Sequence, residues 1–160
     1  MPNKSIIVVI AILGIGLLCP HPSEAYGLRT GFGKVALENV PMGVDYSMQK
    51  DSKFPLVIEN NSDSVVDVKI EVLVPVGDEV QEGYEPIPSA DWIKLEKGSF
   101  TIEPNGKAET DVVISIPNKE EYRGRKFHVF IWSHTIGESL GIGIKSKLLF
   151  SVGEAASVRE

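Results

Sequence analysis

The residues FHVFIWSH, Phe127–His134, set the strongest constraint on the fold. Successive side chains of an extended strand point to opposite faces of its sheet. A strand with one face in water alternates apolar and polar residues. This segment instead carries large apolar groups on both faces: Phe127, Val129, Ile131 and Ser133 share one face, and His128, Phe130, Trp132 and His134 share the other. We therefore expect a central strand with a core on one face and a second cover on the other.

Strand patterns continue through most of the surrounding chain. Residues 66–74 alternate apolar and mostly charged side chains with a period of two, and residues 110–116 alternate in a similar way. Further strand candidates are 34–38, 54–59, 92–95, 100–103 and 142–152. No long window after the N-terminal segment has helical periodicity, and only Ser89–Trp92 predicts a single capped turn.

Turn residues divide these strands at short intervals. Asn60–Ser64 separates two apolar runs, and Pro104-Asn105-Gly106 predicts a tight hairpin because Asn and Gly accept positive φ. About eight or nine strands spaced in this way predict an all-β fold, an immunoglobulin-like antiparallel β-sandwich. We expect one domain over residues 26–160, with its core at 34–153 and a long acidic loop, 76–89, at one end of the sandwich.

The N-terminus has the features of a secretory signal peptide. Lys4 precedes the apolar run 6–18, which is shorter than the roughly 17–25 residues of a membrane-spanning helix, and the small residues Ser23 and Ala25 follow. We expect residues 1–25 to be removed and the mature protein to be exported to the periplasm, the cell surface or the extracellular space. Lipidation of Cys19, the only cysteine, and retention of the segment as an anchor are the alternatives.

The charge distribution bounds the class of partner. The chain of 160 residues has a net charge of −6, and its lysines and arginines form no basic stripe. Nucleic acid and anionic lipid surfaces bind through such stripes. We therefore expect no nucleic-acid partner, and no membrane contact beyond the signal peptide.

Three stretches resemble immunoglobulin-like modules of secreted and envelope proteins of prokaryotes. They are FPLVIENNSD at 54–63, IEPNG at 102–106, and the pair ISIP and YRG at 114–117 and 122–124. Similar patterns occur in PapD-like domains and in the immunoglobulin-like region of WxL surface proteins. The resemblance covers residues 54–150 and implies a non-enzymatic β-sandwich used for adhesion, assembly or wall binding. The basic residues by which PapD-like pilus chaperones hold a subunit's carboxylate are not identifiable in this sequence.

The sequence contains no arrangement that predicts catalysis. His128 and His134 are six residues apart, roughly 20 Å along a strand, which is too far for one zinc ion. No serine lies in a Gly-x-Ser-x-Gly elbow, and the carboxylates of Glu109 and Asp111 are expected to be solvated. Asn60-Asn61-Ser62 is a glycosylation sequon. We expect a protein that is not an enzyme, with no catalytic, cofactor-binding or metal site.

The second face of Phe127–His134 is the candidate interaction surface. Burial of Phe130 or Trp132 is worth about 4–6 kcal/mol each relative to exposure, so a cover is expected. Three alternatives remain for what covers this face: the chain's own loop with Tyr84, Ile87 and Trp92; another protein; or a sugar ring stacked on Trp132. The candidate residues are His128, Phe130, Trp132, His134 and Tyr84.

These features predict a secreted or cell-envelope, non-catalytic module that mediates protein–protein association in an extracellular assembly. Its partner would be another envelope or extracellular protein, or a second copy of the chain. The first alternative is a carbohydrate-binding or cell-wall-binding module, which would bind a glycan through its aromatic side chains. The second alternative is a periplasmic chaperone acting by strand addition, which requires an open sheet edge.

Overall fold

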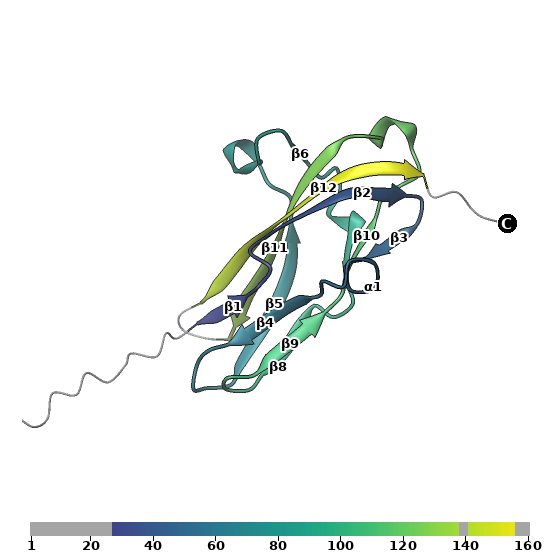
Figure 1. The fold of residues 1–160 in the computed structure, drawn as a ribbon. Coiled ribbons are helices and arrows are strands. Elements are labelled where there is room, and N and C mark those ends of the chain that lie inside the picture. Colours follow the sequence, from purple (N-terminus) through teal and green to yellow (C-terminus); the bar gives the residue numbers. More distant parts are fainter. Residues whose placement is uncertain (1–26, 138–140, 156–160) are drawn as a thin grey trace, which may run out of the picture.

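Strand β11 (Lys126–Ile136), which contains the stretch FHVFIWSH, runs through the middle of a six-stranded sheet. The computed structural model describes residues 27–137 and 141–155. The sheet order is β2 (Lys34–Met42), β12 (Gly143–Ala155), β11, β5 (Val66–Leu73) and β8 (Ser99–Ile102), and the short β6 (Glu85–Pro86) also pairs with β11 (Figure 1). The β12–β2 and β11–β6 pairs are parallel, and the other pairs of this sheet are antiparallel.

Two three-stranded sheets form the opposite layer. One contains β1 (Leu28–Thr30), β4 (Leu56–Asn60) and β9 (Lys107–Thr110), and the other contains β3 (Asp45–Ser47), β10 (Val112–Ser115) and β7 (Ile93–Leu95). Short helical turns connect the strands: α1 (Met48–Asp51), η1 (Gly77–Glu79), η2 (Ala90–Trp92) and η3 (Glu120–Tyr122). The predicted all-β sandwich is therefore confirmed, and the predicted capped turn at Ser89–Trp92 is η2.

The described residues form twelve strands and not the expected eight or nine, and Asp111 accounts for one of the additional breaks. It interrupts the chain between β9 and β10, while α1 interrupts it between β3 and β4. Asp111 is buried, whereas from the sequence we expected it to be solvated. Its carboxylate can be buried because the Ser47 hydroxyl donates to its Oδ2 (2.5 Å) and the Gln49 N–H donates to its Oδ1 (2.9 Å). The Ser47 hydroxyl also accepts the Lys50 N–H (2.9 Å), so Asp111 fixes the residue that caps α1.

The turn at Pro104-Asn105-Gly106 forms as predicted, but it does not join a paired hairpin. The Gly106 N–H donates to the Glu103 carbonyl (2.9 Å), and Asn105 has a φ of 55°. Strand β8 pairs with β5, whereas β9 pairs with β4. The turn therefore carries the chain from one layer of the sandwich to the other.

The inner face of β11 lies at the centre of the core. Phe127, Val129 and Ile131 are fully buried. The Phe127 ring centroid lies 5.4 Å from that of Trp92 and 5.8 Å from that of Phe150. By the same area estimate as for Phe130, burial of the Phe127 ring contributes about 4–6 kcal/mol relative to exposure. Since Trp92 belongs to η2, this aromatic group joins the six-stranded sheet to the opposite layer.

Asn60 anchors the end of β4 to two neighbouring segments. Its Nδ2 donates to the carbonyls of Ser64 (2.8 Å), Ile102 (3.1 Å) and Glu103 (3.1 Å). Its Oδ1 accepts from the N–H (3.0 Å) and the hydroxyl (2.7 Å) of Ser62. The side chain is 1% exposed. The Asn60-Asn61-Ser62 sequon therefore serves the fold, because in the folded protein its amide nitrogen is already occupied.

The substitution Asn60→Ala is expected to lower the free energy of unfolding by about 2–4 kcal/mol, since it leaves several buried carbonyls without a donor. Urea denaturation followed by circular dichroism measures this loss. The matched control is Asn61→Ala, at the exposed neighbouring position, which should change the stability by less than about 0.5 kcal/mol. Equal losses in the two variants would contradict the role assigned to Asn60.

Candidate functional site

The outer face of β11 is divided into a covered half and an open half. His128 is 0% exposed and Phe130 is 5% exposed, and these two residues form the covered half. Trp132 and His134 are half-buried and form the open half. The candidate residues thus lie in one row on one face, but His128 and Phe130 do not reach the surface.

The acidic loop is the cover of the covered half. The Gln81 N–H donates to His128 Nδ1 (3.2 Å). Lys145 on β12 pairs with Glu79 of the loop (2.8 Å), and its Nζ lies 4.6 Å from the centroid of the Phe130 ring. These contacts place the loop and its ion pair over the aromatic residues of β11. The covered half is therefore covered by the chain's own loop, which is the first of the three alternatives from the sequence.

The three loop residues named from the sequence have different positions. Tyr84 is half-buried, and its ring lies 6.0 Å from Lys126 Nζ at the start of β11. Ile87 and Trp92 are buried in the central core and do not cover the outer face, which corrects the expectation for both. Ile87 instead donates its N–H to the His128 carbonyl (3.0 Å), beside β6.

His128 must be neutral for the loop to dock as observed. Its Nδ1 accepts a hydrogen bond from Gln81, so the ring proton lies on Nε2, which has no hydrogen-bond partner among the described residues. Burial lowers the pKa of His128, and the nearby Lys147 and Lys34 lower it further, while Glu79 opposes them. Protonation of His128 at Nδ1 would turn its N–H toward the Gln81 N–H, and it would leave a charged imidazolium buried under the loop.

Docking of the loop is therefore expected to weaken as the pH falls. Because the docked state lowers the pKa of His128, the undocked state binds the proton more readily. The contribution of His128 to docking is complete above about pH 6.5 and is lost as the pH falls below that value. Hydrogen exchange of the Gln81 amide, corrected for intrinsic rate, should show decreasing protection from pH 8 to pH 5.

The control for this experiment is His128→Asn, which removes the titrating group and should remove the pH dependence. A wild-type amide whose protection stays constant or rises on acidification would contradict the role of His128. So would an unchanged pH profile in the variant.

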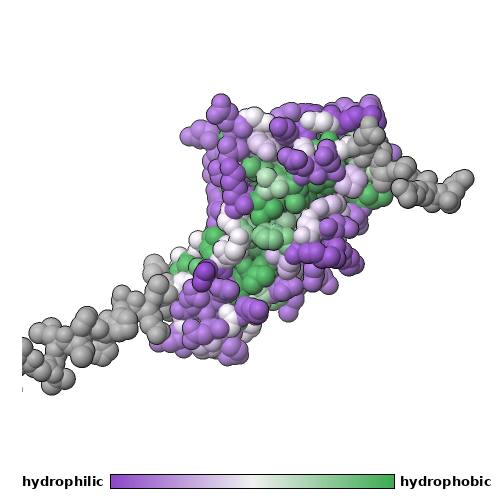
Figure 2. All heavy atoms as spheres, in the orientation of Figure 1, coloured by the Kyte–Doolittle hydropathy of each residue, from purple (hydrophilic) through white to green (hydrophobic). Residues whose placement is uncertain are grey.

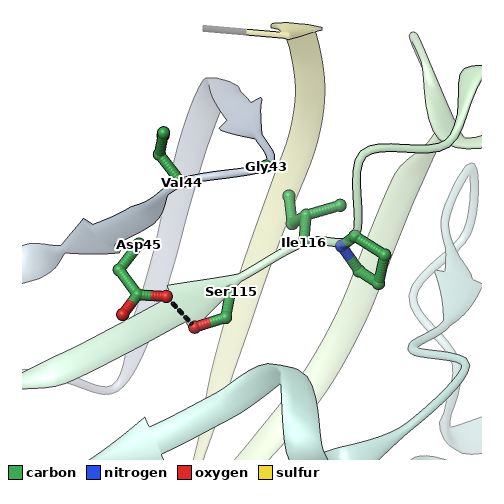
Figure 3. Close-up of a pocket in the computed structure, with 6 residues that line it drawn as sticks. Gly43, Val44, Asp45, Ser115 and Ile116 are labelled. Atoms are coloured by element: carbon green, nitrogen blue, oxygen red, sulfur yellow. Dashed lines mark hydrogen bonds between the residues drawn. The ribbon is translucent and has the colours of Figure 1, made fainter.

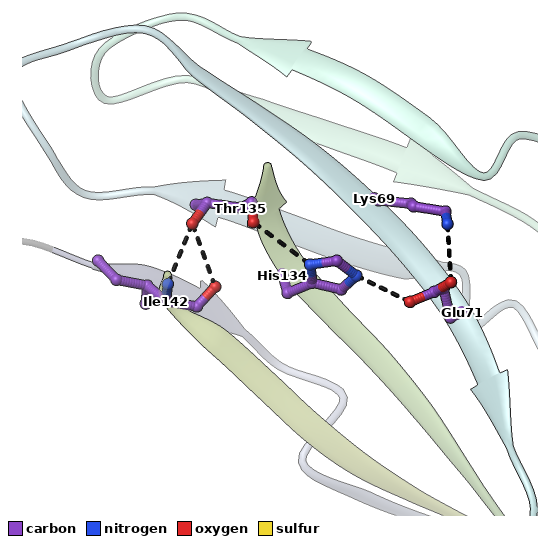
Figure 4. A network of polar contacts seen from close by, with 5 residues as sticks. All are labelled: Lys69, Glu71, His134, Thr135 and Ile142. Atoms are coloured by element: carbon purple, nitrogen blue, oxygen red, sulfur yellow. Dashed lines mark hydrogen bonds and ion pairs between the residues drawn. The ribbon is translucent and has the colours of Figure 1, made fainter. Parts of the chain in front are cut away.

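The open half is fixed by stacking and by an acid–base network (Figure 4). The rings of Trp132 and His134 stack with centroids 4.0 Å apart. His134 Nε2 donates to the Glu71 carboxylate (2.9 Å), which also accepts from Lys69 Nζ (2.7 Å). The hydrogen bond from Lys69 and then that from His134 lower the pKa of Glu71. The stacking on His134, whose ring is held by Glu71, restricts the orientation of Trp132.

Gly143 leaves the space that Trp132 occupies. A Cβ at this position on β12 would lie 2.7 Å from Trp132 Nε1 and 3.1 Å from His134 Cβ. Any side chain there would move the indole. The sequence pattern did not select Gly143, Lys145 or Glu71, because their contribution depends on the strand register, in which Trp132 faces Lys145 and Glu71.

The described cavities lie away from this face. One of about 410 Å³ is formed where the β2–β3 turn meets the end of β10 (Figure 3), and it is lined by Gly43, Val44, Asp45, Ser115, Ile116 and Pro117. There the Ser115 hydroxyl donates to Asp45. Another, of about 540 Å³, lies beside α1 and β7. Neither is lined by His128 or His134, so the His134–Glu71 pair stands on an open sheet face and not in a cleft.

The described residues contain no group of three metal-ligating side chains close enough to hold an ion. Among residues 27–137 and 141–155, no helix is long and apolar enough to span a membrane. The predicted signal peptide and Cys19 lie outside the described residues.

Comparison with solved structures identifies the fold. No family model matches the chain, and no curated protein matches it. A PapD-like (ASH) domain of human CEP192 has a TM-score of 0.59 at 16% identity, over 97% of this chain and 100% of that domain. A Bacteroides ovatus protein described as carbohydrate-binding has a TM-score of 0.60 at 19% identity, over 79% of this chain and 37% of its own length.

The periplasmic chaperone SfaE has a TM-score of 0.52 at 13% identity, over 82% of this chain and 61% of its own length. At these identities the similarities establish the fold. The sandwich has the fold of PapD-like, immunoglobulin-like modules, as the sequence resemblance implied.

Proposed function

We propose that this protein is a non-catalytic binding module that associates with another protein of an envelope or extracellular assembly. The open half of β11, together with Tyr84 at the edge of the acidic loop, is the surface proposed for this contact. The observation that carries the proposal is the position of Trp132, half-exposed on a rigid sheet and fixed by the His134 ring and the space at Gly143.

A fixed, amphipathic aromatic side chain suits protein recognition. Tryptophan is enriched among residues that dominate binding energy, because it buries a large area and has few rotamers to lose. The network of Lys69, Glu71 and His134 surrounds it with donors and acceptors, as expected for the rim of an interface. Export is proposed with this function, on the basis of the N-terminal sequence and of the fold shared with periplasmic chaperones.

The chaperone alternative, in which this protein adds a strand to another protein, is supported less well, because it requires a long open sheet edge. Strand β12 is paired with β11 on one side and, over Lys147–Ala155, with β2 on the other. The free edge strand β2 is interrupted at Asn39 (φ 57°), beside a shift in its register with β12. The regular part of this edge is therefore limited to Lys34–Glu38, which is short for the main-chain pairing that strand addition requires.

Carbohydrate binding is the second candidate because the indole face of Trp132 would also accept a sugar ring. The similarity to the Bacteroides ovatus protein described as carbohydrate-binding supports including it in the test. The two candidates differ in the ligand, and they use the same side chain.

Photo-crosslinking in the native host tests the proposal. With Trp132 replaced by p-benzoylphenylalanine, irradiation should give a discrete adduct between this chain and one protein. The matched control carries the same group at the exposed Lys94, on the opposite layer, and should give no such adduct. The substitution Trp132→Ala should reduce the amount of that protein that is recovered with this chain by about tenfold or more, relative to the wild type. Circular dichroism checks that the variant is folded.

A glycan titration provides the second arm. Tryptophan fluorescence should not change across a panel of soluble glycans, and Trp132→Phe identifies the origin of any change. A saturable change that disappears in Trp132→Phe, without a protein adduct, would replace the protein partner by a carbohydrate. Absence of both adduct and titration would refute the open half as a binding surface.

A further inference from the structure

Strand β2 is an edge strand whose outer backbone groups have no partner among the described residues. It pairs only with β12, at the end of the six-stranded sheet. The Lys147 N–H donates to the Gly33 carbonyl (3.0 Å), and the Asn39 N–H donates to the Ser151 hydroxyl (3.0 Å). Backbone groups of successive residues point to alternate sides of a strand. Those of Lys34, Ala36 and Glu38 therefore point away from β12.

The free segment of β2 is self-complementary in charge. It reads KVALE, Lys34–Glu38. If two such segments pair antiparallel with Ala36 opposite Ala36, each Lys34 faces Glu38 of the second copy. Opposite charges at facing positions of a sheet attract, and small residues fit at the centre of the pair. Lys34 and Glu38 are both exposed, and neither takes part in a salt bridge with the described residues of its own chain.

The inner side of the same segment is apolar and incompletely covered. Val35 and Leu37 point into the sandwich, opposite the fully buried Leu148 and Phe150, yet both are only half-buried. Phe54, which contacts Phe32 just before β2 (ring centroids 5.9 Å apart), is 41% exposed. Figure 2 shows a hydrophobic band across the middle of the face that is turned to the viewer.

We propose that a second copy of this chain pairs with β2 through Lys34–Glu38, about a two-fold axis at Ala36. The backbone groups of Lys34, Ala36 and Glu38 then meet those of the second copy. Val35 faces Leu37 of the second copy on the inner side, which extends the apolar cover of the open edge. Because the axis makes both copies use the same segment, pairing is complete at two chains.

The irregularity at Asn39 limits the paired segment. Its positive φ and the register shift beyond Phe150 bend β2 away from a regular ladder, and Pro41 lacks an N–H. Residues 34–38 are therefore the part of the edge available for regular pairing. A short pair of this kind predicts a reversible dimer.

The dimer would present two open halves on one side. The two-fold axis of an antiparallel pair is perpendicular to the sheet, so both outer faces point in the same direction. Strand β11 is third from the edge, after β2 and β12. With strands about 4.8 Å apart, the two copies of Trp132 lie about 24 Å apart across the strands. They lie about 26 Å apart along the strands, because Trp132 is four residues from His128, which is level with the axis at Ala36. Such a surface would bind a repetitive partner with two contacts at once.

Sedimentation velocity of the purified protein, from about 1 µM to about 1 mM, tests the dimer. The wild type should show a concentration-dependent monomer–dimer equilibrium. Lys34→Glu and Glu38→Lys should each raise the dissociation constant by about tenfold or more, because each places like charges opposite one another twice. The double variant Lys34→Glu/Glu38→Lys should restore dimerisation, since it exchanges the two charges. Lys94→Glu, on another edge strand, is the matched control and should have no effect.

Ala36→Pro provides a test that does not depend on charge. It removes an N–H that points away from β12, so the fold should persist while the dimer is lost. Circular dichroism confirms that the variant is folded. A wild type that stays monomeric at every concentration would overturn the proposal. So would a dimer that persists in Lys34→Glu or in folded Ala36→Pro, or a double variant that remains as weak as the single ones.

Discussion

Burial of both faces of β11 is the constraint on which the rest of the structure depends. On the inner face, Phe127 and its neighbours hold the two layers together through contacts with Trp92 and Phe150. On the outer face, the acidic loop covers His128 and Phe130 through contacts that include the hydrogen bond from the Gln81 N–H to His128 and the Glu79–Lys145 ion pair. The cover stops before Trp132, and that limit leaves exposed the surface that we propose for partner binding.

The layers and the main strands could be predicted from the sequence because their apolar residues repeat with a period of two. The period places Val66, Val68 and Ile70 in the core, where the structure has them. The same period separates the two faces of β11. The period of two could not predict which strands pair with each other. The turn at Asn105 was expected to close a hairpin, but the two strands that it joins belong to different layers. Local turn chemistry fixes a change of direction, whereas the partner of a strand depends on contacts distant in the sequence.

Polar residues were predicted least well, since their surroundings are set by tertiary contacts. Asp111 was expected in water and instead holds the cap of α1, and the sequon residue Asn60 ties three segments together. Within the candidate surface, the period of two placed Trp132 and His134 in one row on β11, which is their arrangement in the structure. It could not distinguish them from His128 and Phe130, because the position of the loop decides which residues remain accessible.

The most direct test of this account is the accessibility of the two tryptophans. ¹⁹F NMR of protein labelled with 5-fluorotryptophan should give two resonances, which Trp132→Phe assigns. A soluble paramagnetic agent should broaden the Trp132 resonance strongly and leave that of Trp92 sharp, since Trp92 lies in the core. Equal protection of both would show that Trp132 is covered, and equal broadening would show that the aromatic core around Phe127 does not form.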